Sequence, residues 1–346
     1  MLKKYKKILI VQTAFNGDVV LTTPLILATK GIFSEAQLSV LTNPRGRELL
    51  EDLAEVNEVI VYDKRGRDRG ALGFFSIIKE LRTKAFELCI CPHRSYRTAL
   101  LTYLAGIPIR IGYYESSFNF LYTLRVHRDG SLHEVMRGLS LLSPFGMEIG
   151  PREHRPFLCV APGVNEWVDG LFDEAGIKGE GLLVGISPGS VWNTKRWIPE
   201  GFAMVAETLE REYGARVLLL GGTEDFEVAQ QILTLTRAKP INLVGKTTLK
   251  QLVGVMERLN LFVSNDTGTM HIAVARGVPV VAIFGPTVPE MGFAPFDKNS
   301  RVLEKKGLYC RPCNPHGPRV CPEGHFQCMR SISPAQVLEA VGELIK

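Results

Sequence analysis

The sequence predicts an α/β protein with two doubly wound units, each a parallel sheet covered by helices on both faces. In both halves of the 346-residue chain, short β-branched apolar runs are followed by Gly, Pro, Asn or Asp and then by a helical period. The runs are apolar on both alternating faces, as strands buried on both sides of a sheet are. Strand–helix alternation that occurs twice along the chain therefore predicts two similar domains.

The expected strands fall into two groups of five. In the first half they are residues 8–12, 38–42, 59–62, 88–91 and 109–113. In the second half they are residues 182–187, 217–220, 241–244, 261–264 and 280–284. Amphipathic stretches between them predict helices, among them residues 74–81, 202–213 and 249–258.

The alternation is interrupted over residues 151–181, where Pro, Gly and charged residues occur together. We therefore expect an N-terminal domain over residues 1–160 and a C-terminal domain over residues 161–330. Residues 331–346, with a helix over 334–345, should form a last segment that packs back toward the N-terminal domain. Two such domains are expected to bind ligands at the carboxyl ends of their strands, in the cleft where they face each other.

Composition and the first residues predict a cytoplasmic protein. Apolar residues make up 45% of the chain and charged residues 22%, as in ordinary globular proteins. No apolar run approaches the roughly 18 residues that a membrane-spanning helix needs. The basic first residues are followed by a short apolar run, 8–11, without the small-residue cleavage site of a signal peptide, so we interpret this run as the first strand.

The net charge of +5 includes two groups of basic residues. The members of these groups are Lys3, Lys4, Lys6 and Lys7 at the start of the chain, and Lys64, Arg65, Arg67 and Arg69. Such groups are often only solvated surface, but they also suit anionic partners. No nucleic-acid-binding module accompanies them, which leaves an acidic or membrane-held acceptor open.

The first of three loops suited to chemistry contains Gly17 and Asp18 and follows the first strand. We expect the next helix to begin near Thr23 and Pro24, because proline suits the first turn of a helix. Asp18 then lies at the carboxyl edge of the first strand and points toward the cleft. An Asp in this position is more often a turn former or helix cap than a catalytic group.

The second loop covers residues 187–190 and continues to Lys195, before a helix signalled by Pro199. The loop begins where a strand ends, and it places the positively charged Lys195 close to the start of the helix. Lys195 either neutralises a diphosphate or is exposed to solvent, and its position alone leaves both interpretations open.

The third loop, residues 264–271, follows a strand and opens a helix. A helix N-terminus offers backbone N–H groups and the positive end of the helix dipole, so it suits a phosphate. Gly268 lets the backbone approach a ligand closely, and Thr267 and Thr269 add hydroxyl donors.

The acidic and histidine side chains of this loop need separate roles. Asp266 cannot favourably face a phosphate, so it should cap the helix or accept hydrogen bonds from sugar hydroxyls. His271 is one turn into the helix, where a core histidine is the commoner case. No Asp-x-Asp pair, which would hold a metal against a sugar diphosphate, occurs in the chain. Lys195 and the amides of residues 267–269 would then stabilise a leaving diphosphate, and no cofactor is expected.

Four of the seven cysteines occur near the C-terminus, with two histidines among them. They are Cys310, Cys313, Cys321 and Cys328. The first pair has the spacing of a zinc half-site, but the second pair is more widely spaced. A structural metal is therefore the weaker interpretation, and reduced thiols are favoured over a disulfide in the cytoplasm.

Three segments together resemble glycosyltransferase family 9, the bacterial heptosyltransferases. They are residues 17–24 (Gly-Asp-Val-Val-Leu-Thr-Thr-Pro), Pro188-Gly189-Ser190 with Lys195-Arg196-Trp197, and residues 265–271 (Asn-Asp-Thr-Gly-Thr-Met-His). Each follows an expected strand, they occur in the family's order, and the resemblance extends along nearly the whole chain. The cysteine-containing tail is similar to that of some heptosyltransferase II members.

The resemblance implies a GT-B fold, in which two Rossmann-like domains face each other. It implies an ADP-heptose donor, the inner core of lipopolysaccharide as acceptor, and inversion at the anomeric carbon without a metal. The partners are then these two substrates and no nucleic acid, with peripheral contact to the cytoplasmic face of the inner membrane as a further expectation.

The resemblance also implies roles for individual residues. Asp18 becomes the general base, and Lys195 acts on the diphosphate as the second catalytic residue. The expected donor site comprises Ser190, Glu224, Asp266, Thr267, Gly268, Thr269 and His271. The expected acceptor site comprises Lys64, Arg65, Arg67, Arg94 and Arg97.

Three other interpretations compete with this one. A heptosyltransferase I, or another family member with a different sugar or acceptor, would share the same motifs. A GT-B-like nucleotide-sugar epimerase would convert the donor sugar without any acceptor. A non-catalytic binding protein would keep Lys195 but have no base at position 18, and the presence of Asp18 disfavours it.

Overall fold

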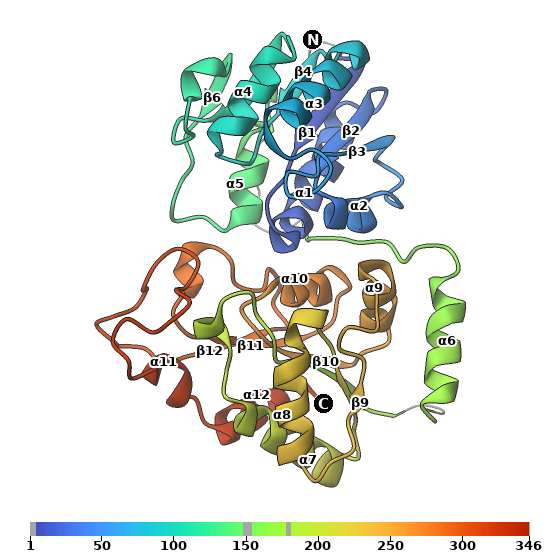
Figure 1. The fold of residues 1–346 in the computed structure, drawn as a ribbon, viewed down its shortest axis with the longest axis vertical. Helices are drawn as coiled ribbons and strands as arrows, with labels where there is room; N and C mark the ends of the chain where they lie inside the picture. Colours follow the sequence, from blue (N-terminus) through green and yellow to red (C-terminus); the bar gives the residue numbers. More distant parts are fainter. Residues whose placement is uncertain (1–4, 148–153, 178–180, 346) are drawn as a thin grey trace. The chain divides into compact units, whose positions relative to one another are not determined.

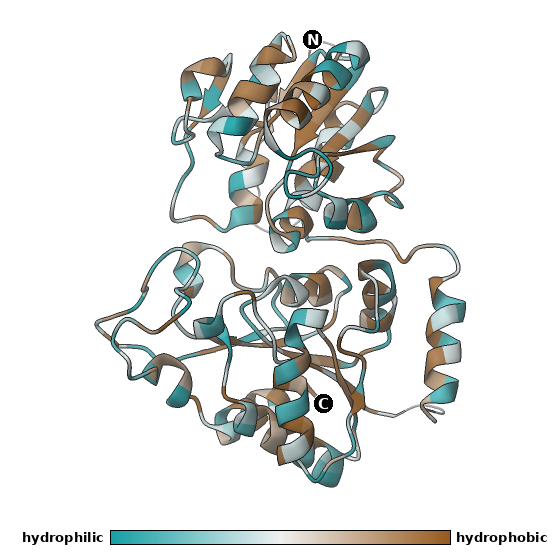
Figure 2. Cartoon of the chain, in the orientation of Figure 1, coloured by the Kyte–Doolittle hydropathy of each residue, from teal (hydrophilic) through white to brown (hydrophobic). Residues whose placement is uncertain are grey.

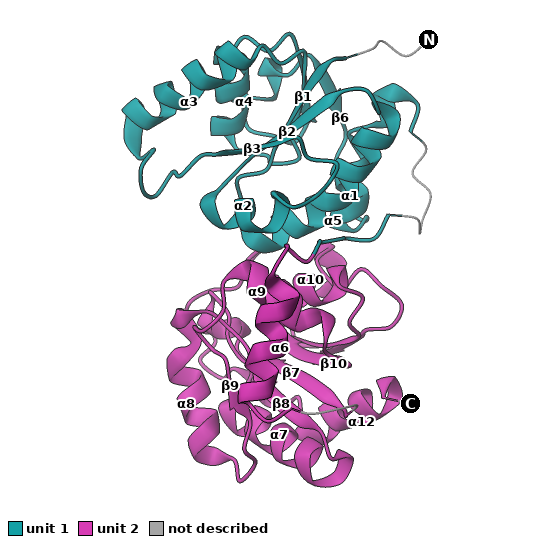
Figure 3. Ribbon diagram, turned by 90° about the vertical axis from the view of Figure 1, so that its right-hand side faces the viewer, with its two compact units in different colours: residues 1–159 teal, residues 160–346 magenta. Residues whose placement is uncertain are grey.

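The computed structural model describes residues 5–147, 154–177 and 181–345 and divides into two compact units, residues 1–159 and 160–346. Each unit is drawn in its own colour in Figure 3. Lys3, Lys4 and the two ends of the expected join, 151–153 and 178–180, are outside the described residues. Within those described ranges, no helix has the length and apolar character needed to cross a bilayer.

Each unit contains one six-stranded sheet, and every pair of neighbouring strands is parallel (Figure 1). The order is β3-β2-β1-β4-β5-β6 in unit 1 and β12-β11-β10-β7-β8-β9 in unit 2. The strands of unit 1 are β1 Lys7–Val11, β2 Gln37–Thr42, β3 Glu58–Val61, β4 Leu88–Ile90, β5 Ile109–Tyr113 and β6 Leu124–Val126. Those of unit 2 are β7 Leu183–Ser187, β8 Arg216–Leu219, β9 Ile241–Asn242, β10 Leu261–Asn265, β11 Val280–Phe284 and β12 Arg301–Glu304.

The strand order reverses between β1 and β4 in unit 1 and between β7 and β10 in unit 2. In doubly wound sheets, ligands bind beside the carboxyl ends of the strands that flank this switch point. The three loops singled out in the sequence follow β1, β7 and β10, so they stand at the places where the fold puts its binding sites.

The predicted fold class is confirmed, and every expected run contains a strand, although β9 covers only the first half of the run 241–244. Figure 2 shows the strands of both sheets coloured mainly as apolar. The sequence analysis did not predict β6 and β12, each of which is one of the two edge strands of its sheet. β6 is largely exposed and β12 is only half-buried. An edge strand is covered on fewer sides, so it lacks the continuous apolar run that marks a central strand.

The start of the first helix differs from the prediction. The helices of unit 1 are α1 Asn16–Ile32, α2 Pro44–Leu50, α3 Gly70–Lys84, α4 Tyr96–Leu104 and α5 Glu134–Ser140, with the short helices η1 Asn119–Leu121 and η2 Ser143–Phe145. Pro24 is inside α1 instead of in its first turn. Proline has no N–H for the carbonyl of Val20, and the Thr23 hydroxyl donates to that carbonyl at 2.7 Å instead. Asp18 consequently belongs to the first turn of α1 and not to the preceding loop.

Unit 2 contains a helix in the segment that was expected to be a join. Its helices are α6 Val164–Glu174, η3 Asn193–Lys195, α7 Pro199–Tyr213, η4 Thr223–Asp225, α8 Phe226–Leu235, α9 Leu249–Glu257, α10 Gly268–Ala275, η5 Pro289–Met291, α11 Gln327–Arg330 and α12 Pro334–Leu344. α6 packs on α9, where Gly254 leaves room: a Cβ there would be 2.4 Å from Val164 Cγ1. α12, which was set apart as a last segment, is part of unit 2 and contributes Val337 and Val341 to its core.

Candidate active site

Asp18 is half-buried in the first turn of α1, the helix that follows β1. Its Oδ2 accepts the backbone N–H of Phe15 at 3.1 Å. This is the helix-capping contact expected of an Asp in this position. A carboxylate has two oxygens and about four lone-pair positions, so a capping contact does not by itself prevent it from accepting a proton. The role of base stays a prediction.

Lys64, from the loop after β3, reaches the carboxyl end of β1. Its Nζ donates to Thr13 Oγ1 at 2.6 Å and is 5.5 Å from the centroid of the Tyr62 ring. Burial, followed by the nearby Arg97 guanidinium, lowers the pKa of Lys64 to about 8. The surroundings of the Lys64 ammonium group therefore disfavour its positive charge, and a bound anion would stabilise that charge.

His93 and Arg94 bring a further loop, the one after β4, to the same group. Burial, and then Lys64 and Arg94, lower the pKa of His93 to about 4, so this imidazole is neutral near pH 7. Of the five expected acceptor residues, Lys64, Arg94 and Arg97 thus lie near one another at the carboxyl edge of the sheet. We call these three residues the acceptor cations.

Arg65 and Arg67, the other two expected acceptor residues, have different surroundings from the acceptor cations. Both are exposed, and they flank the acidic side chains of their own loop. Arg67 Nε is 3.2 Å from Asp68 Oδ1, so this carboxylate offsets the Arg67 charge, and the Arg65 backbone N–H donates to Asp63 Oδ1 at 3.3 Å. The basic group seen in the sequence therefore divides into a half-buried lysine and exposed arginines.

In unit 2, Lys195 and Asp266 form an ion pair with 2.5 Å between Nζ and Oδ2. Both side chains are largely buried, with 12% and 8% exposed. Thr287, which follows β11, donates its hydroxyl to the same carboxylate oxygen at 2.7 Å. The second and third loops of the sequence analysis therefore meet through two of the predicted residues, and the ammonium group is held at the carboxyl ends of β10 and β11.

The Asn265 side chain connects the backbones of these loops through hydrogen bonds. It is fully buried at the end of β10. Its Oδ1 accepts the Trp197 N–H at 3.0 Å, and its Nδ2 donates to the Pro188 carbonyl at 2.8 Å. One amide side chain thus fixes both ends of the loop that carries Lys195.

A chain of hydroxyl groups crosses from β7 to the start of α10. Thr269 Oγ1 donates to Ser187 Oγ at 3.1 Å and is 2.7 Å from Thr267 Oγ1. Gly268 is the first residue of α10, so the backbone N–H groups of its first turn have no acceptors within the helix itself. Hydroxyl and N–H donors are therefore present together beside the Lys195–Asp266 pair.

Asp225, a buried carboxylate that was not singled out in the sequence, packs against the loop after β7. Its Oδ2 accepts the Gly222 N–H at 3.1 Å, and its Oδ1 is 3.5 Å from Arg196 Nη2. Arg196 Nε donates to the Ser190 carbonyl at 2.9 Å. A Cβ on Gly189 would be 2.0 Å from Asp225 Cγ, so the carboxylate fills the space that this glycine leaves. Burial raises the pKa of Asp225.

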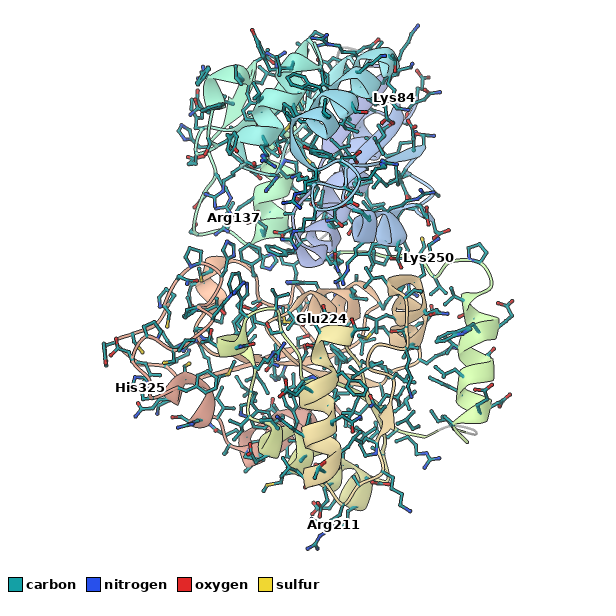
Figure 4. The ribbon with its side chains drawn as sticks, viewed as in Figure 1. Lys84, Arg137, Arg211, Glu224, Lys250 and His325 are labelled. Atoms are coloured by element: carbon teal, nitrogen blue, oxygen red, sulfur yellow. The ribbon has the colours of Figure 1, made fainter. Side chains whose placement is uncertain are left out.

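Ser190, Glu224 and His271 complete the expected donor site and differ in their surroundings. Ser190 is buried in the loop after β7. Glu224 is exposed in η4, at the start of α8 (Figure 4). His271 is buried within α10, as a core histidine would be. Ser190 thus belongs to the loop that carries Lys195, whereas Glu224 is exposed on η4 and His271 is buried within α10.

Three of the four C-terminal cysteines, Cys310, Cys313 and Cys321, are in the irregular segment that leads into α11, whereas Cys328 is buried within α11, and none of the four forms a disulfide. Across the part of the chain that the structure describes, no three or more His, Cys, Asp or Glu side chains are arranged to hold a metal ion. The segment packs on the loop of Lys195 and on the loop after β11. The His316 ring stacks on Trp192 with 6.4 Å between centroids, and the Cys313 N–H donates to the Pro286 carbonyl at 3.0 Å.

Several of these residues had a usable sequence signal. Asn265 and Arg196 are inside the quoted motifs but received no role. Thr287 follows an expected strand by a Gly-Pro pair, and His93 follows another, so the rule that sites form at carboxyl ends of strands identifies both. The sequence could not single out Asp225, because its neighbour Glu224 is also acidic. The two residues differ in burial, which only the structure shows.

Comparisons with known proteins agree with this arrangement. The model of glycosyltransferase family 9 (heptosyltransferase) matches residues 74–322. The lipopolysaccharide heptosyltransferase 2 of Salmonella typhimurium is 28% identical over 353 residues and is covered, like this chain, to 98%. A glycosyl transferase family 9 structure from Veillonella parvula has a TM-score of 0.90 at 27% identity, over 99% of this chain and 98% of that chain. The E. coli ADP-heptose lps heptosyltransferase II structure has a TM-score of 0.78 at 26% identity, over 98% of each chain.

The family model spans well over half of the chain, and the relatives match it from end to end. The two Rossmann-like units and the three loops at the carboxyl ends of β1, β7 and β10 agree with that match. The chain therefore belongs to glycosyltransferase family 9, the heptosyltransferases, and has their GT-B fold.

Proposed function

We propose that this chain is a heptosyltransferase II that transfers heptose from ADP-heptose to the inner core of lipopolysaccharide. The relative from Salmonella typhimurium and the E. coli structure both carry the name of that enzyme. The observation that carries the proposal is their match over nearly the whole chain, joined to the group of donors around Lys195 at the switch point of unit 2.

The donor is assigned to unit 2. The N–H groups at the start of α10 and the hydroxyls of Thr267 and Thr269 supply hydrogen-bond donors for a diphosphate. Lys195 supplies the positive charge, and Asp266, 2.5 Å away, orients it. Arg196 pairs with Asp225 and donates to the Ser190 carbonyl, and these two contacts hold the Ser190 loop in place.

The reaction is a single displacement. Asp18 takes the proton of an acceptor hydroxyl while that oxygen bonds to the anomeric carbon of the heptose. The bond from that carbon to the diphosphate oxygen breaks, and ADP leaves with the electron pair. Attack from the face opposite ADP inverts the anomeric centre. Lys195 and the N-terminus of α10 stabilise the charge that grows on ADP. The chain has no Asp-x-Asp pair, so no metal is given a part in this step.

The acceptor is assigned to unit 1. The acceptor cations Lys64, Arg94 and Arg97 suit an anionic inner-core sugar, and Arg65 and Arg67 add longer-range attraction. Because the acceptor is anchored in lipid, the enzyme acts at the cytoplasmic face of the inner membrane.

The test is incubation of the purified protein with ADP-heptose, in the presence of EDTA, and with lipopolysaccharide acceptors truncated at successive inner-core sugars. Mass spectrometry should find one added heptose on one acceptor of the series, and NMR should find the inverted anomer. Transfer to none of the acceptors would overturn the proposal. Conversion of ADP-heptose without acceptor would favour an epimerase, and transfer that depends on added magnesium or manganese would contradict the metal-free step.

A further inference from the structure

Three exposed aromatic side chains form one surface in unit 1, in the loops after β4 and β5. Tyr96 begins α4, and Phe118 and Phe120 belong to the turn of η1. They are 47%, 46% and 70% exposed. The ring centroids of Tyr96 and Phe118 are 5.8 Å apart, and those of Phe118 and Phe120 are 5.7 Å apart. We call this continuous apolar surface the aromatic patch.

The backbone beneath the aromatic patch is held in a costly conformation. Phe118 has a φ of +60°, in the left-handed region that bulky residues rarely adopt. The loop is fixed there, because the Ser117 N–H donates to the Arg94 carbonyl at 3.2 Å and the Leu121 N–H to the Phe118 carbonyl at 3.0 Å. A strained backbone beneath exposed aromatic rings is typical of a surface that a partner covers.

Positive charge borders the aromatic patch. Arg97 Nε donates to the Tyr96 hydroxyl at 3.4 Å, and both Arg94 and Arg97 are exposed. The acid of the same loop, Glu115, accepts the Arg128 backbone N–H at 2.9 Å, and its Oε1 is 3.3 Å from His127 Nδ1. Aromatic rings beside arginines are the composition that binds an anionic bilayer, with rings at headgroup level and guanidinium groups on phosphates.

We propose that the aromatic patch docks on the surface of an anionic membrane and inserts Phe118 and Phe120 among the headgroups. The inference rests on the proposed function, since a lipid-anchored acceptor brings the enzyme to a membrane, and it goes further by naming the surface that makes contact. Arg94 and Arg97 belong both to the border of the patch and to the acceptor cations. Docking therefore brings the anionic sugars of an acceptor directly to Lys64.

The test is co-flotation of the full-length protein with vesicles of phosphatidylglycerol and phosphatidylethanolamine, without donor or acceptor. The test variant is Phe118→Asn/Phe120→Ser, because asparagine tolerates the left-handed backbone of position 118. We expect vesicle affinity to fall by about tenfold or more, with melting temperature and ADP affinity unchanged. The wild-type protein should not float with phosphatidylcholine vesicles, and equal binding to both compositions would overturn the anionic part of the proposal.

The matched control is Leu72→Ser/Phe75→Ser on α3. These side chains are 88% and 59% exposed, so the control removes a similar amount of exposed apolar surface from the same unit. It should bind vesicles as the wild type does. Wild-type binding by the aromatic-patch variant, or an equal loss in the α3 control, would overturn the proposal. If the double variant does not fold, Phe120→Ser alone decides the question in the same way.

A second readout separates this inference from the proposed function. The aromatic-patch variant should transfer heptose to a soluble, deacylated acceptor at the wild-type rate and to vesicle-embedded acceptor more slowly. An equal loss on both acceptors would place the patch in sugar binding and overturn membrane docking. If the wild-type protein binds vesicles through the aromatic patch but transfers no heptose, the proposed function is overturned and the membrane docking stands.

Discussion

The carboxylate of Asp18 has a structural contact that an amide can replace. Asparagine at this position keeps an oxygen for the Phe15 N–H, now accepted at 3.1 Å, but cannot take a proton from an acceptor. We expect Asp18→Asn to keep the melting temperature and ADP affinity near wild type while heptose transfer falls by about two to four orders of magnitude. The three quantities are measured on one preparation. Near-normal transfer would show that Asp18 is only a cap.

Lys195 is expected to act through its own charge and not only through its ion pair. Lys195→Ala should lower kcat by about 10²–10³-fold, the effect of losing one donor to a leaving oxyanion. It also leaves the Asp266 carboxylate buried without its cation, which lowers the free energy of unfolding. Adding Asp266→Asn should restore stability without restoring turnover. Recovered turnover in the double variant would assign Lys195 a purely structural role.

The lowered pKa of Lys64 predicts a pH dependence of acceptor binding. The ammonium charge is present below the pKa of about 8 and is lost as the pH rises through it. An anionic acceptor needs that charge, so the KM for acceptor should rise from about pH 7 to about pH 9. Lys64→Arg stays charged throughout and should have a flat profile. Identical profiles in the two proteins would assign the titration to another group.

At the scale of elements, the loop after β7 depends on the absence of a side chain at Gly189. A Cβ there would meet Asp225, which cannot move aside because it accepts the Gly222 N–H and pairs with Arg196. Gly189→Ala should lower the free energy of unfolding by about 1–3 kcal/mol and weaken ADP binding. Denaturant unfolding and calorimetry measure the two effects.

Gly31→Ala is the matched control for this substitution. Gly31 is in α1, and no heavy atom would be within 4 Å of an added Cβ. Alanine at this helical position should stabilise unit 1 by up to about 1 kcal/mol. Wild-type ADP affinity in Gly189→Ala would mean that the loop after β7 is not part of the donor site.

Local sequence patterns predicted the bounds of most elements, but the start of α1 is an exception that a side chain explains. Proline usually signals the start of a helix, and this rule placed the start of α1 near Pro24. The hydroxyl of Thr23 accommodates the proline inside the helix, a substitution of donors that residue spacing does not reveal. β6 and β12 were missed for a different reason, since edge strands need no continuous apolar run.

At the scale of the whole molecule, the two units have separate sheets and separate buried cores, so each is expected to fold by itself. Residues 160–346 expressed alone should bind ADP within about tenfold of the full-length affinity and transfer no heptose. Residues 1–159 alone should bind anionic vesicles but not ADP. A folded C-terminal unit that fails to bind ADP would place part of the donor site in unit 1.

The sequence by itself determined the fold class, the repetition of one α/β pattern, and the loops that follow β1, β7 and β10. These features depend on hydrophobic periodicity and on turn-forming residues, which are properties of neighbouring positions in the chain. The family resemblance rested on the same loops, because their order along the chain is also a local property.

Only the tertiary structure decided which side chains of different loops meet. Lys195 and Asp266 are 71 positions apart and in direct contact. Lys64, in the loop after β3, and Arg97, at the start of α4, also approach each other, whereas the neighbouring Arg65 is exposed. Such pairings are set by strand order, by burial and by the direction in which each loop leaves its sheet. Local patterns carry none of these quantities, so the grouping of charges into sites required the folded chain.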